Sequence, residues 1–223
     1  MLNDFMIWTS RISPLVLAVG VLLGLRSYRE LNHKNRLVFY FLIVFLLTDI
    51  LSRFSREWFG LNGNLYLFSW SAFAEYCFFG LLYTRHFITK NITQLKWLFP
   101  FLGVLLLVNL GRISVAFELN HFQVYDRLFV DGLILILTLC HIYIIIDSKV
   151  KVTKDEQFFN IILLLYVTVD LFMSSTINFM VNAELSLVLS FWFIRLIFMI
   201  LLHIQLVSEI WKNGMKQKHK RFG

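Results

Sequence analysis

Seven apolar stretches, separated by short polar connectors, constrain this chain more than any other feature of its sequence. A helix needs about 20 predominantly apolar residues to cross the roughly 30 Å hydrocarbon core of a bilayer. Only helices satisfy all backbone hydrogen bonds within one such segment. We therefore predict an all-α fold, a seven-transmembrane helix bundle that forms a single transmembrane domain over residues 1–223. The predicted spans are 12–25, 37–54, 65–87, 95–113, 128–146, 158–180 and 187–210, followed by a short basic tail, 212–223.

The composition fits a membrane protein. The chain is 58% hydrophobic and 16% charged, whereas soluble domains carry about 25% charged residues. The net charge of +7 could indicate nucleic-acid binding, but the Lys and Arg residues lie between apolar stretches, where membrane topology requires them. We expect the lipid bilayer as the main partner, no nucleic acid, and a multi-pass location in a bacterial cytoplasmic membrane.

The distribution of basic residues predicts the orientation. Of the 21 Lys and Arg residues, fifteen lie near loops one, three and five or in the tail, and five lie in the N-terminal segment and the other loops. Positively charged connectors stay on the cytoplasmic side. The N-terminus is therefore predicted outside and the C-terminus inside.

The spacing of the spans raises the hypothesis of an internal repeat. Spans two and six begin near positions 36 and 158, and spans three and seven begin near 64 and 186, so that both offsets are 122. Asp49 and Asp170 lie 121 positions apart. Parallel 3+1+3 repeats of this kind occur in transporters. Evenly spaced helices of bilayer length would produce the same offsets without duplication.

Three ionisable side chains fall deep within predicted spans. At 1.5 Å per residue, Glu75 lies about 16 Å and Arg195 about 13 Å from the outer boundary, and Asp170 about 18 Å from the inner one. Burying such a group at the bilayer centre costs about 2.5–3.5 kcal/mol, and such residues usually face the bundle interior or water. The shared depth predicts a polar pocket that opens outward and ends at these three residues.

Further polar residues lie above this level, while the inner half is poorer in them. Asp49–Arg53 and Arg127–Asp131 have the i,i+4 spacing of same-face pairs, and Tyr166, Asp170, Ser174 and Asn178 recur every four residues. With Glu75, Asp170 and Arg195, the candidate ligand-binding residues are Asp131, Ser174, Asn178, Asn109, Arg112, Asp49, Arg53 and Trp192.

Several functions are disfavoured by missing residues. A retinal protein needs a lysine within a span, and every Lys lies in a connector or at a membrane edge, so no retinal or other cofactor is expected. His141 and His203 stand alone on separate spans, without a zinc-binding HxxxH or HExxH pair, and are predicted to be packing histidines with satisfied nitrogens. We expect no metal, no catalytic residues and no enzyme.

The third span, with Asn64-Leu65-Tyr66-Leu67-Phe68-Ser69-Trp70 leading to Ala74-Glu75-Tyr76-Cys77-Phe78, resembles a pattern in small uncharacterised seven-helix bacterial integral membrane proteins. Those proteins place one Glu followed by an aromatic in a Tyr- and Phe-rich third helix, so that the resemblance implies a central place for Glu75. The 3+1+3 layout is similar to that of seven-helix transporters and opsins, an analogy of architecture alone.

Together these features predict an integral membrane protein whose outward-facing intramembrane pocket binds and transports a small polar solute or ion. Arg195 would hold an anionic group, and Glu75 and Asp170 a cationic group or a proton. One alternative is a ligand sensor or accessory subunit that signals through a protein partner at the basic cytoplasmic loops. Another is that the charges only pair between helices and define their register.

Overall fold

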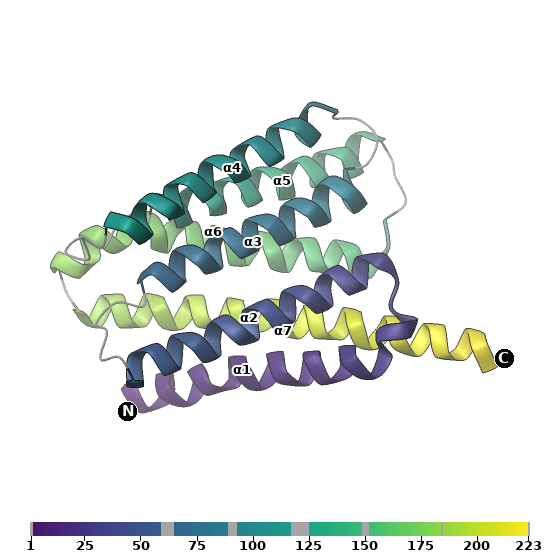
Figure 1. The fold of residues 1–223 in the computed structure, drawn as a ribbon, viewed down its shortest axis with the longest axis horizontal. Helices are drawn as coiled ribbons and strands as arrows, with labels where there is room; N and C mark the ends of the chain where they lie inside the picture. Colours follow the sequence, from purple (N-terminus) through teal and green to yellow (C-terminus); the bar gives the residue numbers. More distant parts are fainter. Residues whose placement is uncertain are drawn as a thin grey trace.

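Seven α-helices run up and down in an elongated bundle, with the two termini at opposite ends (Figure 1). The computed structural model describes the backbone of residues 2–58, 65–88, 93–116, 125–148, 152–183 and 185–222. Side chains are described for the same residues except 2–8, 10, 55–58, 65–66, 68, 93–97, 112–116, 148, 177–183, 185–189 and 216–222. The elements are α1 (Leu2–Ser27), η1 (Tyr28–Glu30), α2 (His33–Trp58), α3 (Leu65–Leu82), η2 (Tyr83–Phe87), α4 (Thr93–Ala116), α5 (Tyr125–Ser148), α6 (Lys154–Ala183) and α7 (Leu185–Phe222).

The prediction of an all-α fold with seven helices is confirmed. Five stretches of the described residues are long and apolar enough to cross a membrane: Arg11–Glu30, His33–Phe54, Tyr125–Asp147, Lys154–Thr176 and Ser190–Met215. A shorter apolar stretch, Leu98–Gly111, lies in α4.

The outer surface of the bundle is apolar. Leu15 and Leu22 of α1 are 65% and 66% exposed, and Ile146 of α5 is 73% exposed. Extended apolar surface on this scale is unfavourable in water, whereas in a bilayer these side chains contact lipid. The chain is therefore a multi-pass membrane protein.

Six helices form a closed ring in the order α1, α2, α3, α5, α6 and α7, because each packs against the next and α7 packs back against α1. α4 packs against α3 from outside this ring. α1 approaches its neighbours closely at Gly20, where a Cβ atom would lie 2.6 Å from Val207 Cγ2 on α7 and 2.8 Å from Leu42 Cδ1 on α2.

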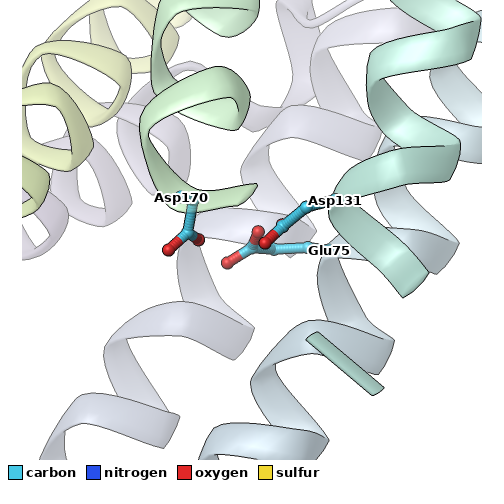
Figure 2. Close-up of side chains that lie close together, drawn as sticks. All are labelled: Glu75, Asp131 and Asp170. Atoms are coloured by element: carbon cyan, nitrogen blue, oxygen red, sulfur yellow. The ribbon is translucent and has the colours of Figure 1, made fainter. Parts of the chain in front are cut away.

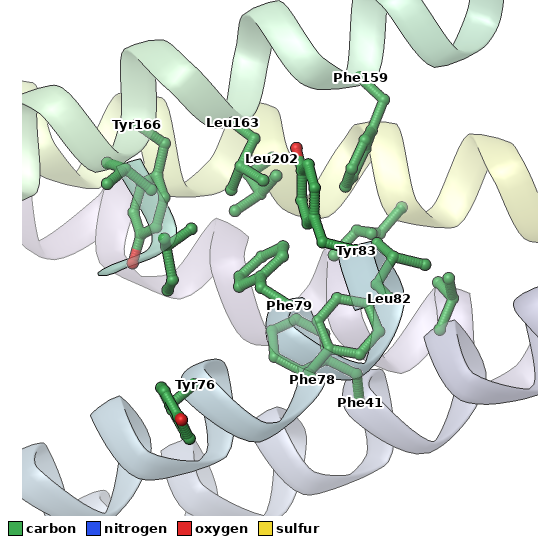
Figure 3. Packing of buried hydrophobic residues seen from close by; sticks show 14 of the residues in the cluster. Phe41, Tyr76, Phe78, Phe79, Leu82, Tyr83, Phe159, Leu163, Tyr166 and Leu202 are labelled. Carbon is green, nitrogen blue, oxygen red and sulfur yellow. The ribbon is translucent and has the colours of Figure 1, made fainter. Parts of the chain in front are cut away.

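The ring interior is filled by aromatic and branched side chains (Figure 3). Phe41 of α2 stacks on Phe78 of α3 with ring centroids 3.9 Å apart, and Phe79 meets Phe41 edge-on at 5.6 Å. These rings fill the space between α2, α3 and the helices opposite, and contribute the dispersion energy that membrane helices need because lipid offers no hydrophobic drive for their association.

The third predicted span is divided into two parts. α3 ends at Leu82 and continues as the π-helical turn η2, in which the Ile88 amide donates to the Tyr83 carbonyl at 2.7 Å, five residues back. The wider turn changes the register of the last residues, so that both Tyr83 and Phe87 face His141 of α5.

Most helices extend a few residues past their predicted spans, and two of them, α1 and α7, extend by ten residues or more at one end. α1 begins at Leu2 instead of near residue 12, and passes through Arg11 and Pro14. α7 continues to Phe222, through the residues predicted as a tail after 210. Bilayer thickness sets only the minimum length of a spanning helix, and the Lys, Gln and Met residues of the tail are good helix formers.

Candidate functional site

Polar side chains from four helices, α3, α5, α6 and α7, converge inside the ring. We call this group the charge cluster. It comprises Glu75 of α3, Arg127 and Asp131 of α5, Tyr166 and Asp170 of α6, and Arg195 of α7. Five of these residues are at most 2% exposed, and the Arg195 side chain is 11% exposed. The interior of this membrane protein is thus strongly charged at one level.

Arg127 lies at the centre of the charge cluster. Its Nε donates to Asp170 Oδ2 at 2.8 Å, and its Nη2 donates to Glu75 Oε2 at 2.8 Å and to the Tyr166 hydroxyl at 2.5 Å. Asp131 Oδ1 lies 3.5 Å from Nε, one helical turn along α5. One guanidinium therefore contacts all three carboxylates, which come from three different helices.

Asp170 receives a second guanidinium, that of Arg195. Arg195 Nε donates to Asp170 Oδ1, and Nη2 lies 3.2 Å from Oδ2. The Arg195 guanidinium carbon lies 5.0 Å from the centroid of the Trp192 ring, in cation–π geometry. Asp170 therefore links α5 to α7, and Trp192 lies against Arg195, the most exposed member of the cluster.

Tyr166 connects the remaining members. Its hydroxyl accepts the hydrogen bond from Arg127 and lies 3.2 Å from both carboxylate oxygens of Glu75, to which it donates. Arg127 and Tyr166 thus stabilise the Glu75 carboxylate.

Asp131 differs from the other two acids. It is fully buried, and among the described residues neither of its carboxylate oxygens has a hydrogen-bond partner. Figure 2 shows the Asp131 carboxyl group directed at that of Glu75, with Asp170 beside them. An ionised carboxylate that is desolvated without hydrogen-bond donors is strongly unfavourable, so Asp131 is the least satisfied group in the cluster.

The charges of the cluster do not balance. Two guanidinium groups face three carboxyl groups, which leaves one excess negative charge when all five are ionised. The excess can be removed by one proton or by one bound cation.

The three carboxyl groups also have the spacing of a cation site. Glu75, Asp131 and Asp170 each offer an oxygen within 4.8 Å of the others (Figure 2). The Arg127 guanidinium, however, already contacts all three carboxylates. A metal ion would have to displace this fixed positive charge, so the donor set fits a proton better than a metal.

The structure brings Glu75, Asp170 and Arg195 together, as their shared depth predicts. Asp131 joins them, and Ser174 lies buried one turn from Asp170. The side chains of Arg112 and Asn178 lie outside the described residues. The role of these residues as ligands stays a prediction.

The predicted pair Asp49–Arg53 is present, with Arg53 Nε donating to Asp49 Oδ2 at 3.0 Å. Both side chains are partly exposed, at 31% and 43%, unlike the buried carboxylates of the charge cluster. The predicted pair Arg127–Asp131 is an ion-pair contact, but it is not a local pair near the membrane surface. Arg127 instead extends into the ring and bonds to α3 and α6.

Asn109 lies at a different place from the cluster. Its amide donates to Asp126 Oδ1 of α5, beside a cavity of about 440 Å³ between α4 and α5. The lining residues are Leu105, Leu106, Asn109, Tyr125, Asp126, Leu128 and Phe129. The lining of this cavity is mostly apolar. It does not include Glu75, Asp170 or Arg195, the residues at which the predicted pocket ends.

Sequence reasoning missed Arg127 and Tyr166 as members of the site. A signal was present for both: Tyr166 lies on the same four-residue stripe as Asp170, and Arg127 lies one turn before the buried Asp131. The Cα of Arg127 lies near the start of α5, above the level of the three deep residues, so its position along the helix does not indicate that its side chain reaches them.

The two buried histidines differ from each other. His203 Nδ1 lies 3.3 Å from the Ser13 hydroxyl of α1, so that it is a packing histidine with a satisfied nitrogen, as predicted. His141 is 4% exposed, and among the described residues neither ring nitrogen has a hydrogen-bond partner. The prediction of a satisfied histidine is wrong for His141.

Comparison with known proteins adds no further assignment, because no family model, no curated protein and no solved structure matches this chain.

Proposed function

We propose that this multi-pass membrane protein binds a proton at the charge cluster and carries it across the membrane. The observation that supports this most directly is Asp131, a fully buried carboxyl group without a hydrogen-bond donor among the described residues. Protonation removes its negative charge and balances the two arginines against Glu75 and Asp170. Ionisable residues at bilayer depth that pair in this way commonly form proton relays.

A small polar solute is the second part of the proposal. Arg195 is the most exposed member of the cluster and stacks on Trp192. An anionic group of a solute could replace the Asp170 carboxylate as the ion-pair partner of Arg195. Asp170, having lost this cation, would then bind a proton more readily. Proton binding and solute binding would be coupled through this one carboxylate.

The proposed orientation has the N-terminus outside and the C-terminus in the cytoplasm of a bacterial cell. The end of the bundle that holds Lys34 and Lys212, called the basic end below, would face the cytoplasm, as positively charged connectors do. A C-terminal green fluorescent protein should then fluoresce. A cysteine at Asn62, in a chain without Cys77 and Cys140, should react with an impermeant maleimide in intact cells. The reverse labelling pattern would overturn the orientation.

A 3+1+3 repeat stays a proposal. It is supported by the place of α4 outside the six-helix ring. The two aspartates that suggested it occupy different environments, however: Asp170 is fully buried, whereas the Asp49 side chain is 31% exposed. A duplication would therefore have left different roles in the two halves.

A sensor is the alternative function, and α7 favours it. This helix extends from Arg195 in the cluster to Glu209 and Lys212 at the basic end, where Lys34 lies 3.7 Å from Glu209 and Lys212 bonds to Asp155 at 2.6 Å. A protonation change at the cluster could reach a partner protein along α7. Crosslinking in native membranes that captures a stoichiometric partner, with no proton flux in liposomes, would favour the sensor.

The test uses purified protein in liposomes that contain a pH-sensitive dye, with a potassium diffusion potential to drive protons inward. The wild-type protein should acidify the lumen. Because a positioned proton-transfer group is worth about 10²–10⁴-fold, Asp131→Asn and Glu75→Gln should slow acidification by about a hundredfold or more. Asp147→Asn, an exposed aspartate on the same helix, is the matched control and should behave as wild type. Wild-type flux no greater than that of empty liposomes would overturn the proposal.

A further inference from the structure

The buried faces of α3, α5 and α6 share an alternation of polar and apolar side chains. Each of the three helices carries a polar residue of the charge cluster, then an apolar residue one turn closer to the basic end, then a second polar level. The sets are Glu75 and Phe79 on α3 with Tyr83 on its continuation η2, Asp131, Ile134 and His141 on α5, and Tyr166, Leu163 and Asn160 on α6. All nine residues are at most 4% exposed, so the ring contains two polar levels separated by an apolar one.

The second polar level is formed by Tyr83, Asn160 and His141, here called the histidine layer. The Tyr83 hydroxyl donates to Asn160 Oδ1. The His141 ring meets Tyr83 edge-on, with centroids 5.8 Å apart, and lies 4.8 Å from the Phe87 centroid. The π-helical turn η2 places both rings against His141, whose nitrogens have no hydrogen-bond partner among the described residues.

An apolar plug separates the histidine layer from the charge cluster. Phe79, Ile134, Leu163 and Leu202 are at most 2% exposed, and Figure 3 shows Leu163 and Leu202 between Tyr166 and Tyr83. At 1.5 Å per residue, Tyr166 and Asn160 are about 9 Å apart along α6, and Asp131 and His141 about 15 Å apart along α5. A direct hydrogen bond cannot cover such distances, so a proton needs transient water to cross, with the buried Thr138 hydroxyl of α5 as a further polar group between Ile134 and His141.

The histidine layer lies close to charged groups at the basic end. Lys34 Nζ lies 4.9 Å from the centroid of Phe87, the ring that contacts His141. Lys34 also lies 3.8 Å from Glu156 and 3.7 Å from Glu209, and these side chains are 14–31% exposed. The charged groups that face His141 are therefore Glu156 of α6 and Lys34 of α2, with the Tyr83 hydroxyl of η2 beside its ring.

We propose that His141 is a second proton-binding site, on the far side of the plug from Asp131, and that the plug is the barrier between the two sites. This inference rests on the proposed proton transport. The Asp131 carboxyl group loses its proton through transient water in the plug, and a ring nitrogen of neutral His141 accepts it. The products are the Asp131 carboxylate and a His141 imidazolium, which then releases the proton at the basic end.

The test combines the liposome flux assay with ¹⁵N NMR of the histidine side chains of the whole protein. We expect His141→Phe, which keeps an aromatic ring, to slow proton flux by about a hundredfold. His203→Gln alters the other buried histidine, which bonds to Ser13 instead, and should leave flux unchanged. Leu163→Ser, which hydrates the plug, should raise flux above that of wild type. The His141 signal, identified by its loss in His141→Phe, should titrate in wild type and in Asp131→Asn.

The two proposals fail in different ways. If wild type and Asp131→Asn differ as expected but His141→Phe conducts like wild type, the second site is refuted and the charge cluster stands. If Leu163→Ser leaves flux unchanged, the plug is not the barrier. If wild type carries no protons but His141 titrates, proton transport is refuted, and only proton binding by His141 stands. A His141 that never titrates refutes the second site whatever the flux. Melting temperatures close to wild type are required of each variant, and His141→Gln replaces His141→Phe if the latter is unstable.

Discussion

Removal of the Arg127 guanidinium should destabilise the protein more than any surface substitution. Arg127→Met keeps a long side chain but leaves Glu75 without its cation, and leaves Asp170 with Arg195 alone. Breaking a buried ion pair by removal of one partner costs about 3–5 kcal/mol, because the remaining charge is uncompensated. The Arg127 side chain is 1% exposed, and those of its three carboxylate partners are at most 3% exposed. Solvent therefore does not screen the charges that the substitution leaves uncompensated.

The expected change in melting temperature follows from this cost. One kcal/mol shifts the melting temperature of a chain of 150–250 residues by about 2–4 °C, so Arg127→Met should lower it by about 6–20 °C. Adding Glu75→Gln to Arg127→Met removes one uncompensated carboxylate. The double variant should therefore recover part of the loss, with a coupling energy of about 0.5–3 kcal/mol.

The assay is thermal unfolding in detergent micelles, followed by tryptophan fluorescence. Arg53→Ala is the control, because Arg53 has the same i,i+4 relation to an aspartate but is 43% exposed. Exposed ion pairs contribute about 0–1 kcal/mol, so this variant should melt within about 4 °C of wild type. Equal melting temperatures for Arg127→Met and Arg53→Ala, or no recovery in the double variant, would refute the reasoning.

Three further predictions concern packing and hydrogen bonding, and each is measured by the same melting assay. Gly80→Leu should cost about 1–3 kcal/mol, because a Cβ atom at Gly80 already overlaps the Phe99 ring of α4. Gly111→Ala is its control and should be neutral or stabilising, because a Cβ atom at Gly111 would have no other atom within 4 Å. Tyr166→Phe should cost about 1–3 kcal/mol, because it deprives both Arg127 and Glu75 of a buried hydrogen bond; wild-type stability would contradict this geometry. Trp192→Leu should cost about 0.5–2 kcal/mol through the lost cation–π contact, and unchanged or increased stability would contradict a stabilising contact.

Much of the charge cluster could be predicted from depth along the helices. Glu75, Asp170 and Arg195 lie at a shared level because each is a similar number of residues from a helix end, and the rise per residue is constant. Arg127 escaped this count because its Cα lies near the start of α5, while its long side chain extends inward to Glu75 and Asp170. Counting Cα positions does not register how far a guanidinium reaches.

Spacing along one helix could not decide which pairs are buried. Asp49–Arg53 and Arg127–Asp131 have the same i,i+4 relation, yet the first is exposed and the second is enclosed. In a soluble protein an amphipathic pattern would show which face is inside. A helix in lipid is apolar on every side, so its sequence carries little of that signal.

The sequence by itself determined that this is an all-α membrane protein, because long apolar stretches in lipid must satisfy their own backbone hydrogen bonds as helices. It also predicted that Glu75, Asp170 and Arg195 lie at one level along their helices. Only the tertiary structure decided which helix faces meet. It thereby decided that Arg127 contacts three carboxylates, that the Asp131 oxygens and the His141 nitrogens have no hydrogen-bond partner among the described residues, and that an apolar layer lies between these two side chains. The reason is that partner choice inside a bundle depends on the rotation and side-chain reach of several helices at once, and those quantities arise only when the helices pack.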